Sequence, residues 1–461
     1  KAKEFSCVEL VQAALQQIES HNEQLNCVVH RNDGSAIARA IEIDAAGTFN
    51  HPLTGIPYLT KDNFCEKNVP STACSKILCN PDYAPTFDST TTNRLHTAGA
   101  ISLGKSNTDP FTMGASTEYS CFGPTLNPWD TSCVAGGSSG GSAAGIAAQM
   151  CLFSLGTDSG GSIRQPASFC NCVALRPTYG RISRYGVMSM VSSLDTIGPM
   201  ARTVEDVSII LEVIAGQDTL DATTGTQPVP SYRDAFSDDI TGITIGLPKE
   251  YCIDGIDPDV ETAVQTAINE FESMGATIKE VSLPHTEYAV ATYCVLAHSE
   301  ASSNMARYDG IRYGYSDDCQ AERPPAGRTG SRSLIEEYFQ TRSDGFEDEV
   351  KRRIMLGTYA LSAGYYDAYY RQAQKVRRLI AQDFEQAFEN VDVIVAPVSP
   401  TPAFQVGAHS DDPVAMYLED IFLDAQPMAG IPALALPCGF SKNGLPIGMQ
   451  LVASDFAESR L

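Results

Sequence analysis

The sequence lacks long apolar runs and an excess of positive charge, and each absence excludes a class of protein. No stretch reaches the roughly 18 consecutive apolar residues of a membrane-spanning helix, so no membrane span is expected. Asp and Glu number 56 against 32 Lys and Arg, which gives a formal net charge of −24. Phosphate backbones repel a surface of this sign, so we do not expect direct binding of nucleic acid. The N-terminal stretch has the spacing of a surface helix rather than a signal peptide.

Paired cysteine ligands are also missing. The 14 cysteines are scattered along 461 residues without any CxxC arrangement, and no metal site is predicted. The two nearest in sequence, Cys170 and Cys172, stand in an apolar stretch, and we expect them to be reduced, buried thiols. Reduced thiols favour a reducing compartment, either the cytosol or the mitochondrial matrix.

The chain does have a regular alternation of helical and strand-like patterns. Hydrophobic residues make up 43 % of the sequence, which supports a large core. Helical spacing at about 5–21, 34–45 and 88–99 alternates with short apolar runs such as 56–59 and 100–103. This alternation predicts an α/β fold in which helices cover a sheet.

Two clusters of glycine and serine stand in the middle of the chain, GGSSGG at 136–141 and DSGGSIRQP at 158–166. Closely spaced glycines let backbone N–H groups converge on one point, as in phosphate sites and oxyanion sites. A phosphate site is disfavoured, because neither cluster supplies the lysine or the ribose-binding acid of the known nucleotide motifs. A flexible linker is disfavoured too, because apolar segments flank both sides of the first cluster.

An acyl-transfer site requires a hydroxyl nucleophile, a base and oxyanion donors. Ser162 follows three residues, Ser159 to Gly161, whose N–H groups can face the oxygen that develops beside an attacking serine. The seven histidines all lie outside both clusters, so a Ser-His-Asp triad stays open but has nothing in its favour. Lys61 ends a strand-like run and can act as a base if burial keeps it neutral. Without further context an exposed surface lysine is the more ordinary interpretation of Lys61.

That context comes from three motifs. GIPYLTKDNF at 55–64, AGGSSGGSAAG at 135–145 and the long stretch that begins GTDSGGSIRQP at 156 resemble the amidase signature family in order and spacing. Ser138 and Ser162 stand 24 residues apart, which is the interval of that family. The resemblance covers nearly the whole chain. It implies a large mixed central sheet with helices on both faces, in a single domain over residues 1–461 with a helical excursion at about 285–390.

The resemblance also assigns roles. It implies that Ser162 is the nucleophile, that Ser138 relays the proton beside a cis peptide bond, and that Lys61 is the base. It maps the oxyanion-binding N–H groups onto Ser159, Gly160, Gly161 and Ser162. Asp158 and Arg164 flank this site and would support it.

Within the family, the likeness is to the A subunits of glutamyl-tRNA(Gln) amidotransferases, carried by the stretches 299–316, 345–380 and 416–439. Glutamine presents a carboxylate and an ammonium at one end, so its pocket needs one cation and one anion. By this likeness Arg353 would bind the α-carboxylate and Asp420 the α-ammonium, while Tyr293 would contact the same end. We prefer Arg353 over its neighbour Arg352 as the carboxylate ligand. Each assignment has a simpler alternative: Arg353 could lie on a solvated helix face, Asp420 could be a surface carboxylate, and Tyr293 could be a core aromatic residue.

The resemblance implies partners as well. Ammonia would pass to a B-type subunit, assembled with a small third subunit, where ATP and Mg²⁺ serve the amidation of Glu-tRNA(Gln). This chain would hold no cofactor, and the partner would carry most of the tRNA contact. An insertion at 317–331 and a short N-terminal helix indicate a mitochondrial form, with the cytoplasm as the alternative. A free-standing amidase of small or lipid amides and a non-catalytic assembly protein are the competing hypotheses.

Overall fold

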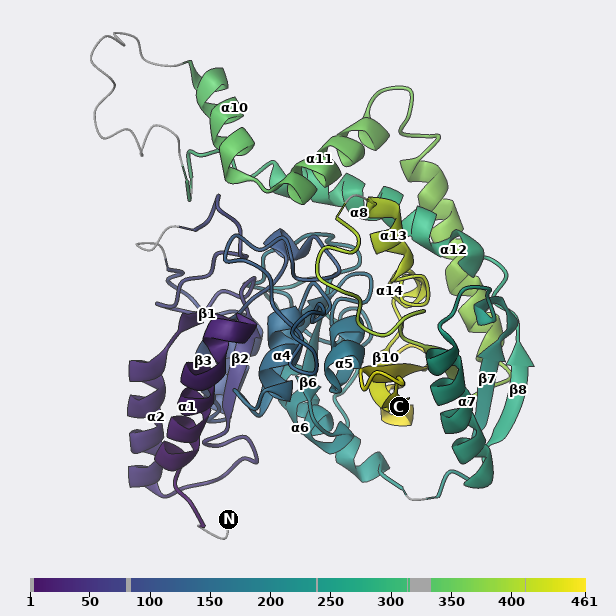
Figure 1. Cartoon of the computed structure of the whole chain (residues 1–461), viewed down its shortest axis with the longest axis horizontal. Helices are drawn as coiled ribbons and strands as arrows, with labels where there is room; N and C mark the ends of the chain where they lie inside the picture. The colour runs from purple at the N-terminus through teal and green to yellow at the C-terminus, as the bar shows by residue number, and fades with distance from the viewer. Residues whose placement is uncertain (1–3, 80–83, 238, 313, 316–332, 411) are drawn as a thin grey trace.

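The computed structural model describes residues 4–461 apart from 80–83, 238, 313, 316–332 and 411. Within these residues a mixed sheet of 11 strands runs across the molecule in the order β1-β3-β2-β4-β6-β5-β10-β11-β9-β7-β8 (Figure 1). The strands are β1 (Val28–Arg31), β2 (Pro57–Lys61), β3 (Ile101–Ser106), β4 (Phe153–Asp158), β5 (Val173–Arg176), β6 (Thr196–Ala201), β7 (Thr244–Pro248), β8 (Thr277–Val281), β9 (Val393–Pro397), β10 (Ala433–Phe440) and β11 (Pro446–Val452).

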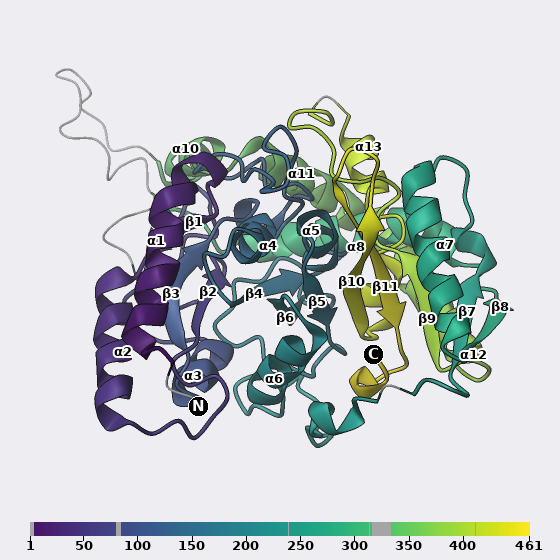
Figure 2. The same ribbon diagram turned by 60° about the horizontal axis from the view of Figure 1, so that its bottom comes forward.

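Helices cover both faces of the sheet, as Figure 2 shows. On β2, Leu59 packs into a cluster with the helices of one face, and its neighbour Tyr58 packs into the cluster of the opposite face. Such alternation follows from the two-residue period of a strand. The helices are α1 (Cys7–Leu25), α2 (Asp33–Ala46), α3 (Thr90–Thr97), α4 (Gly140–Ala147), α5 (Arg164–Cys170), α6 (Val204–Ile214), α7 (Pro258–Ser273), α8 (Ala289–Met305), α10 (Leu334–Gly345), α11 (Asp348–Leu361), α12 (Tyr370–Ala387), α13 (Pro413–Leu418) and α14 (Ala425–Ala429).

The predicted elements are confirmed to within a few residues. The apolar runs at 56–59 and 100–103 are β2 and β3, and the helical spacing at 5–21, 34–45 and 88–99 corresponds to α1, α2 and α3. The fold class, a large mixed sheet with helices, is therefore as predicted. The insertion expected at 317–331 lies outside the described residues.

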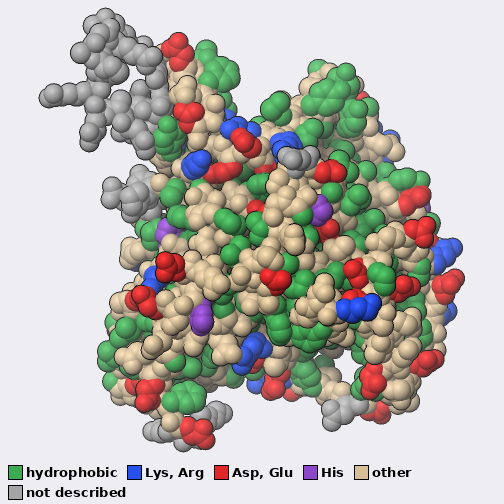
Figure 3. All heavy atoms as spheres, in the orientation of Figure 1, with side chains coloured by type: hydrophobic (Ala, Val, Ile, Leu, Met, Phe, Trp, Pro, Cys, Tyr) green, Lys and Arg blue, Asp and Glu red, His purple; other side chains and the backbone are tan. Residues whose placement is uncertain are grey.

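The helices of the predicted excursion, α8 and α10 to α12, lie between β8 and β9 in the chain. α8 packs against both α11 and α12, and α12 also contacts α14. The tip where α11 and α12 meet carries a group of exposed hydrophobic side chains, visible in Figure 3. They are Met355, Leu356, Tyr359, Tyr365, Tyr366 and Tyr369. No helix in the described part of the chain is long and apolar enough to cross a bilayer.

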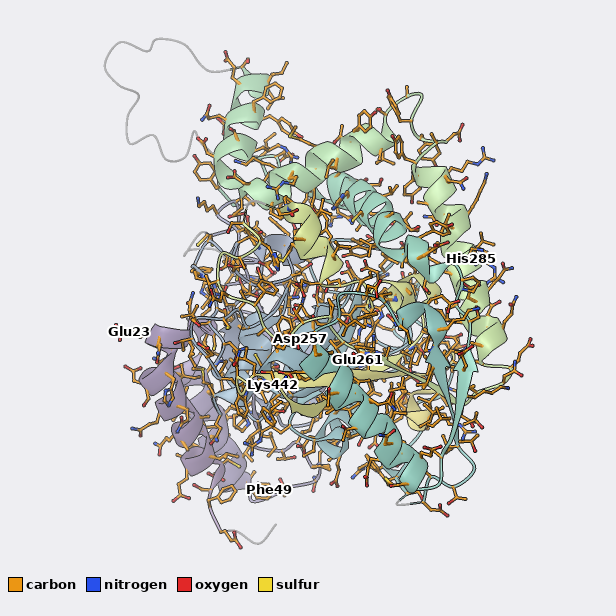
Figure 4. All side chains as sticks on the ribbon, turned by 45° about the vertical axis from the view of Figure 1, so that its right-hand side comes forward. Glu23, Phe49, Asp257, Glu261, His285 and Lys442 are labelled. Carbon is orange, nitrogen blue, oxygen red and sulfur yellow. The ribbon has the colours of Figure 1, made fainter. Side chains whose placement is uncertain are left out.

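The β10–β11 hairpin is fixed against α7. Asp257 caps α7 by accepting from the Asp259 N–H, and Lys442 in the hairpin lies 2.9 Å from Asp259 (Nζ to Oδ1). Figure 4 shows Lys442 beside the end of α7 that carries Asp257 and Glu261. Gln450 of the same hairpin accepts a hydrogen bond from Arg164, the first residue of α5, at 2.8 Å, so the hairpin is also tied to α5.

Candidate active site

Lys61 ends β2 and is fully buried. Its Nζ lies 2.7 Å from Ser138 Oγ, 2.8 Å from Ser139 Oγ and 3.4 Å from the Thr157 carbonyl oxygen. Burial lowers the pKa of Lys61 from 10.5 to about 7, and Asp109 opposes the shift. No described carboxylate forms an ion pair with Lys61. A neutral amine is therefore available at neutral pH, as a base requires.

Ser138 is also fully buried, and the Gly137–Ser138 peptide bond is cis. Its loop is fixed from two sides. The Gly137 N–H donates to Gln165 Oε1 at 2.9 Å, and the Thr117 hydroxyl donates to the Ser138 carbonyl at 3.3 Å. The hydroxyl of Ser138 is thus held beside the lysine that ends the neighbouring strand.

Ser162 belongs to the second glycine cluster, between β4 and α5. The Ser139 N–H donates to its carbonyl oxygen at 3.1 Å, which joins the two clusters directly. Ser162 is 9 % exposed, whereas Lys61 and Ser138 are completely covered. The structure therefore places Lys61 in contact with Ser138 and joins the Ser162 loop to theirs, and Ser162 is the member of the predicted triad that is not completely covered.

One predicted oxyanion donor is used elsewhere. The Gly161 N–H donates at 2.9 Å to Asp158 Oδ1, so the expectation that it points at the substrate oxygen is wrong for this geometry. The physical reason is that the Asp158 carboxylate reaches Gly161, three residues further along the loop, and accepts this N–H. Gly161 has φ +116°, and a Cβ there would lie 2.5 Å from Leu423 Cδ1, so this position requires glycine. Ser159, Gly160 and Ser162 remain as predicted donors.

Asp158 and Arg164 support the loop, as predicted from their place beside it. Arg164 Nε donates to Asp158 Oδ2 at 3.0 Å, and both groups are fully buried. Burial alone would raise the pKa of Asp158, but Arg164 and Arg176 outweigh it and lower that pKa to about 2. Arg164 also donates to the Leu423 carbonyl at 2.9 Å and to Gln450 Oε1 at 2.8 Å. This arginine ties the nucleophile loop to the segment after α13 and to β11.

Asp109 is a nearby carboxyl that the sequence did not single out. It is fully buried, accepts from the Thr117 N–H at 2.9 Å, and lies against Gly137, where a Cβ would be 2.5 Å from its Oδ2. Burial raises the pKa of Asp109 to about 7. It stands in a stretch without a recognisable motif, and only its contact with the cis loop reveals it.

Arg353 lies on the inner face of α11. It is 5 % exposed, its Nε donates to Glu349 at 2.7 Å, and its guanidinium lies 5.6 Å from the centre of the Tyr417 ring. Burial lowers the pKa of Arg353, but Glu349 and Tyr417 outweigh that effect and the net shift is upward. Its two Nη atoms donate to no described residue. The side chain of Arg352 is 39 % exposed, so Arg353 is the buried one of these two arginines.

Tyr293 on α8 packs directly against the nucleophile loop. A Cβ on Gly160 would lie 2.6 Å from Tyr293 Cζ, so the absence of a side chain at 160 permits the contact. Burial raises the pKa of Tyr293 well above its usual range. Tyr293 and Arg353 thus come from separate helices and lie near each other, because each affects the pKa of the other.

Asp420 follows α13 and accepts from Gln165 Nε2 at 3.3 Å. Because Gln165 Oε1 accepts from the Gly137 N–H, one side chain links Asp420 to the loop that holds Ser138. Burial raises the pKa of Asp420 well above its usual range, and Glu419 adds to the shift. A second carboxyl that the sequence did not single out, Asp424, lies beside Tyr293 at Gly160.

Comparison with known proteins places the whole chain in one group. The model of the amidase family matches residues 9–461. A protein of Geobacter metallireducens, named as the A subunit of glutamyl-tRNA(Gln) amidotransferase, is 51 % identical over 464 residues, covering 100 % of this chain and 93 % of that protein. The protein of the same name from Geobacillus thermodenitrificans is 51 % identical over 460 residues, covering 99 % and 92 %. The crystal structure of the corresponding Thermotoga maritima protein has a TM-score of 0.79 at 36 % identity, covering 99 % and 92 %.

Proposed function

The chain belongs to the amidase signature family, and from this premise we propose that it is the glutamine-hydrolysing A subunit of a glutamyl-tRNA(Gln) amidotransferase. The observation that carries the proposal is the buried contact of Lys61 Nζ with Ser138 Oγ, at 2.7 Å, in the loop whose next residue, Ser139, donates its N–H to the Ser162 carbonyl. The name of the full-length relatives supplies the acceptor, a glutamyl-tRNA, and the transfer of an amide nitrogen.

The triad would act by passing one proton inward. As Ser162 Oγ attacks the carboxamide carbon of glutamine, its proton moves to Ser138 and the proton of Ser138 moves to the neutral amine of Lys61. Backbone N–H groups of the loop bind the oxyanion of the tetrahedral intermediate. The carbon–nitrogen bond then breaks, the leaving nitrogen takes up the proton through the same route, and ammonia departs. Water hydrolyses the resulting glutamyl ester and regenerates Ser162.

The amino-acid end of glutamine would lie between α8, α11 and the segment after α13. Arg353 has two Nη groups without a partner among the described residues, which suit a carboxylate bound through a pair of parallel hydrogen bonds. Asp420 would bind the α-ammonium, and Tyr293 would form the wall between them. These assignments come from the family resemblance, and the burial of Arg353 and the bond of Asp420 to Gln165 support them.

Partners follow from the same proposal. A B-type subunit and a small third subunit would assemble with this chain, and the B-type subunit would use ATP and Mg²⁺ to amidate Glu-tRNA(Gln). The formal charge of −24 suits a chain that leaves the tRNA to another subunit. The exposed hydrophobic tip of α11 and α12 is a surface of the kind that protein partners cover.

The location stays a prediction. The relatives reported above are bacterial proteins, so they give no support to the mitochondrial form that the insertion and the short N-terminal helix indicated. We keep the mitochondrial matrix and the cytoplasm as the two proposals, which subcellular fractionation of the source cells would separate.

The alternative function is a free-standing amidase of small amides, and one observation favours it. A cavity of about 750 Å³ is lined mostly by apolar side chains of α8, α11 and the 414–422 segment, and Tyr417 and Cys294 are among the residues that line it. An apolar acyl group would fit there. The buried Arg353 argues against such a substrate, because an apolar group beside it would leave its guanidinium without a partner.

The experiment is ammonia release from glutamine by the chain assembled with its partners. We expect glutamine to be hydrolysed in preference to apolar amides such as hexanamide, and the Ser162→Ala variant to release no ammonia. Preference for the apolar amide would favour the free-standing amidase and overturn the proposed function.

A further inference from the structure

Asp424 is a buried carboxyl that lacks donors among the described residues. It is 1 % exposed, and its Oδ1 accepts no hydrogen bond from any of them. None of the described Lys, Arg or His side chains forms an ion pair with it. A buried carboxylate without donors is strongly disfavoured unless a ligand supplies them.

The place of Asp424 in the chain makes this lack of donors informative. Asp424 stands directly before the short helix α14, at the N-cap position, where an aspartate ordinarily accepts from the first helical N–H groups. Here its side chain makes no such bond. It is therefore turned away from the helix that it could cap.

The side chain instead faces the nucleophile loop. A Cβ on Gly160 would lie 2.7 Å from Asp424 Oδ1 and 2.6 Å from Tyr293 Cζ, so the carboxyl and the ring meet at the residue two before Ser162. The neighbouring residues make a similar contact, because Leu423 packs on Gly161. Asp424 thus lies beside the site and not merely in the core behind it.

Its position is rigidly fixed. Arg164 donates to the Leu423 carbonyl at 2.9 Å and to Gln426 Oε1 at 3.1 Å, so one buried guanidinium holds the residues on both sides of Asp424. The same guanidinium binds Asp158 of the nucleophile loop. The donors of Arg164 are occupied by these acceptors, which leaves Asp424 for a group that enters the site.

On the premise of the proposed function, we propose that Asp424 acts with Asp420 to bind the α-ammonium of the substrate, and so selects amides whose carbon skeleton carries a cationic amine. An ammonium offers three N–H donors, which two neighbouring carboxylates can share, and Asp420 already accepts one hydrogen bond from Gln165. Burial and Asp420 both hold the pKa of Asp424 well above its usual range, and a cation bound between the two carboxyls relieves that repulsion.

The test compares glutamine with glutaramate, which is glutamine without its α-amino group, as substrates of the assembled enzyme. For Asp424→Asn we expect kcat/KM for glutamine to fall about 10- to 100-fold, mainly through KM, and kcat/KM for glutaramate to change less than about threefold. Asp234→Asn, at an exposed carboxylate away from the site, is the matched control and should leave both values unchanged.

Two results would overturn the inference while the proposed function stands: an equal loss for both substrates, or no loss for glutamine. A wild-type enzyme that hydrolyses glutaramate as well as it does glutamine would also overturn the inference, whereas failure to hydrolyse glutamine would overturn the proposed function itself. Binding of glutamine to Ser162→Ala, with and without Asp424→Asn, measures the same effect without turnover and should show the same loss of affinity.

Stability provides a second readout, independent of any substrate. If Asp424 serves the ligand and not the fold, Asp424→Leu should raise the Tm of the ligand-free chain, because an apolar side chain suits a buried site without donors. A Tm that falls in both Asp424→Leu and Asp424→Asn would show a structural role and contradict the inference.

Discussion

The two ends of the candidate site differ in how completely their polar groups are paired. At the nucleophile end, Lys61 Nζ has three oxygen atoms within 3.4 Å, and Asp158 is held by two arginines. At the amino-acid end, neither Asp424 Oδ1 nor the Nη groups of Arg353 have a partner among the described residues. The first end is complete without a substrate, and the second is not.

This difference indicates a division of labour. Groups that move protons are preorganised, because their geometry must be right before the reaction begins. Groups that recognise the substrate lack hydrogen-bond partners in the free protein, and the charged groups of the substrate supply those partners. Changes at the first end should therefore affect kcat, and changes at the second should affect KM.

The largest effect is expected for Ser162→Ala, which removes the attacking oxygen. Glutamine hydrolysis should fall by at least about 10⁴-fold, with an unchanged Tm, because the side chain makes no bond on which the fold depends. Steady-state ammonia release measures the loss of hydrolysis, and thermal unfolding measures the Tm. Ser273→Ala, at the exposed end of α7, is the matched control, and turnover of wild-type size in Ser162→Ala would refute the assignment.

Lys61→Met should lower kcat by about 10³-fold, because the proton of Ser138 then has no acceptor. KM should stay within about threefold of its wild-type value, since Lys61 does not face the amino-acid end. Lys67→Met, an exposed lysine six residues on, controls for the loss of charge. A rise in KM without a fall in kcat would contradict the claim that the nucleophile end determines kcat and the amino-acid end determines KM.

At the other end, Arg353→Lys should raise KM for glutamine about 10- to 100-fold and change kcat little, because an ammonium cannot replace two parallel guanidinium donors. Arg352→Lys is the matched control, since that residue pairs with the same Glu349 from the exposed face of α11. Equal effects of the two variants would place the carboxylate-binding cation elsewhere.

The smallest effect is a dependence on pH. Lys61 accepts a proton only when neutral, and its pKa is about 7, so kcat/KM should fall as the pH drops through 7. Between pH 8 and pH 6 the fall should be about tenfold. Asp109 also has a pKa of about 7, so Asp109→Asn is informative. It should move the midpoint downward, because the lost carboxylate no longer favours the ammonium; disappearance of the midpoint would make Asp109 the titrating group.

The same two ends show how far the sequence alone can go. Local pattern made Ser162 and Lys61 candidates, because one follows a run of Gly and Ser and the other ends a recognisable strand. Their roles, and that of Ser138, came from the family resemblance. Arg353, Asp420 and Tyr293 could be named only through the family resemblance, because helix spacing alone does not reveal which faces meet.

Two features escaped prediction for a physical reason. The direction of the Gly161 N–H depends on the Asp158 carboxylate turning back along the loop, which no spacing rule reveals. Asp424 reads from the sequence as an ordinary residue before a helix. Its lack of a cap bond, and its contact with Gly160, appear only when distant segments pack together.

The most direct test of the account is an NMR titration of the lysine side chains, labelled with ¹³C at Cε, in the wild type and in Lys61→Met. Desolvation of Lys61 predicts one resonance that titrates near pH 7 and is absent from the variant, while exposed lysines titrate near their usual value of about 10.4. If every lysine titrates above pH 9, Lys61 is charged at neutral pH, Ser138 has no base beneath it, and the account is contradicted.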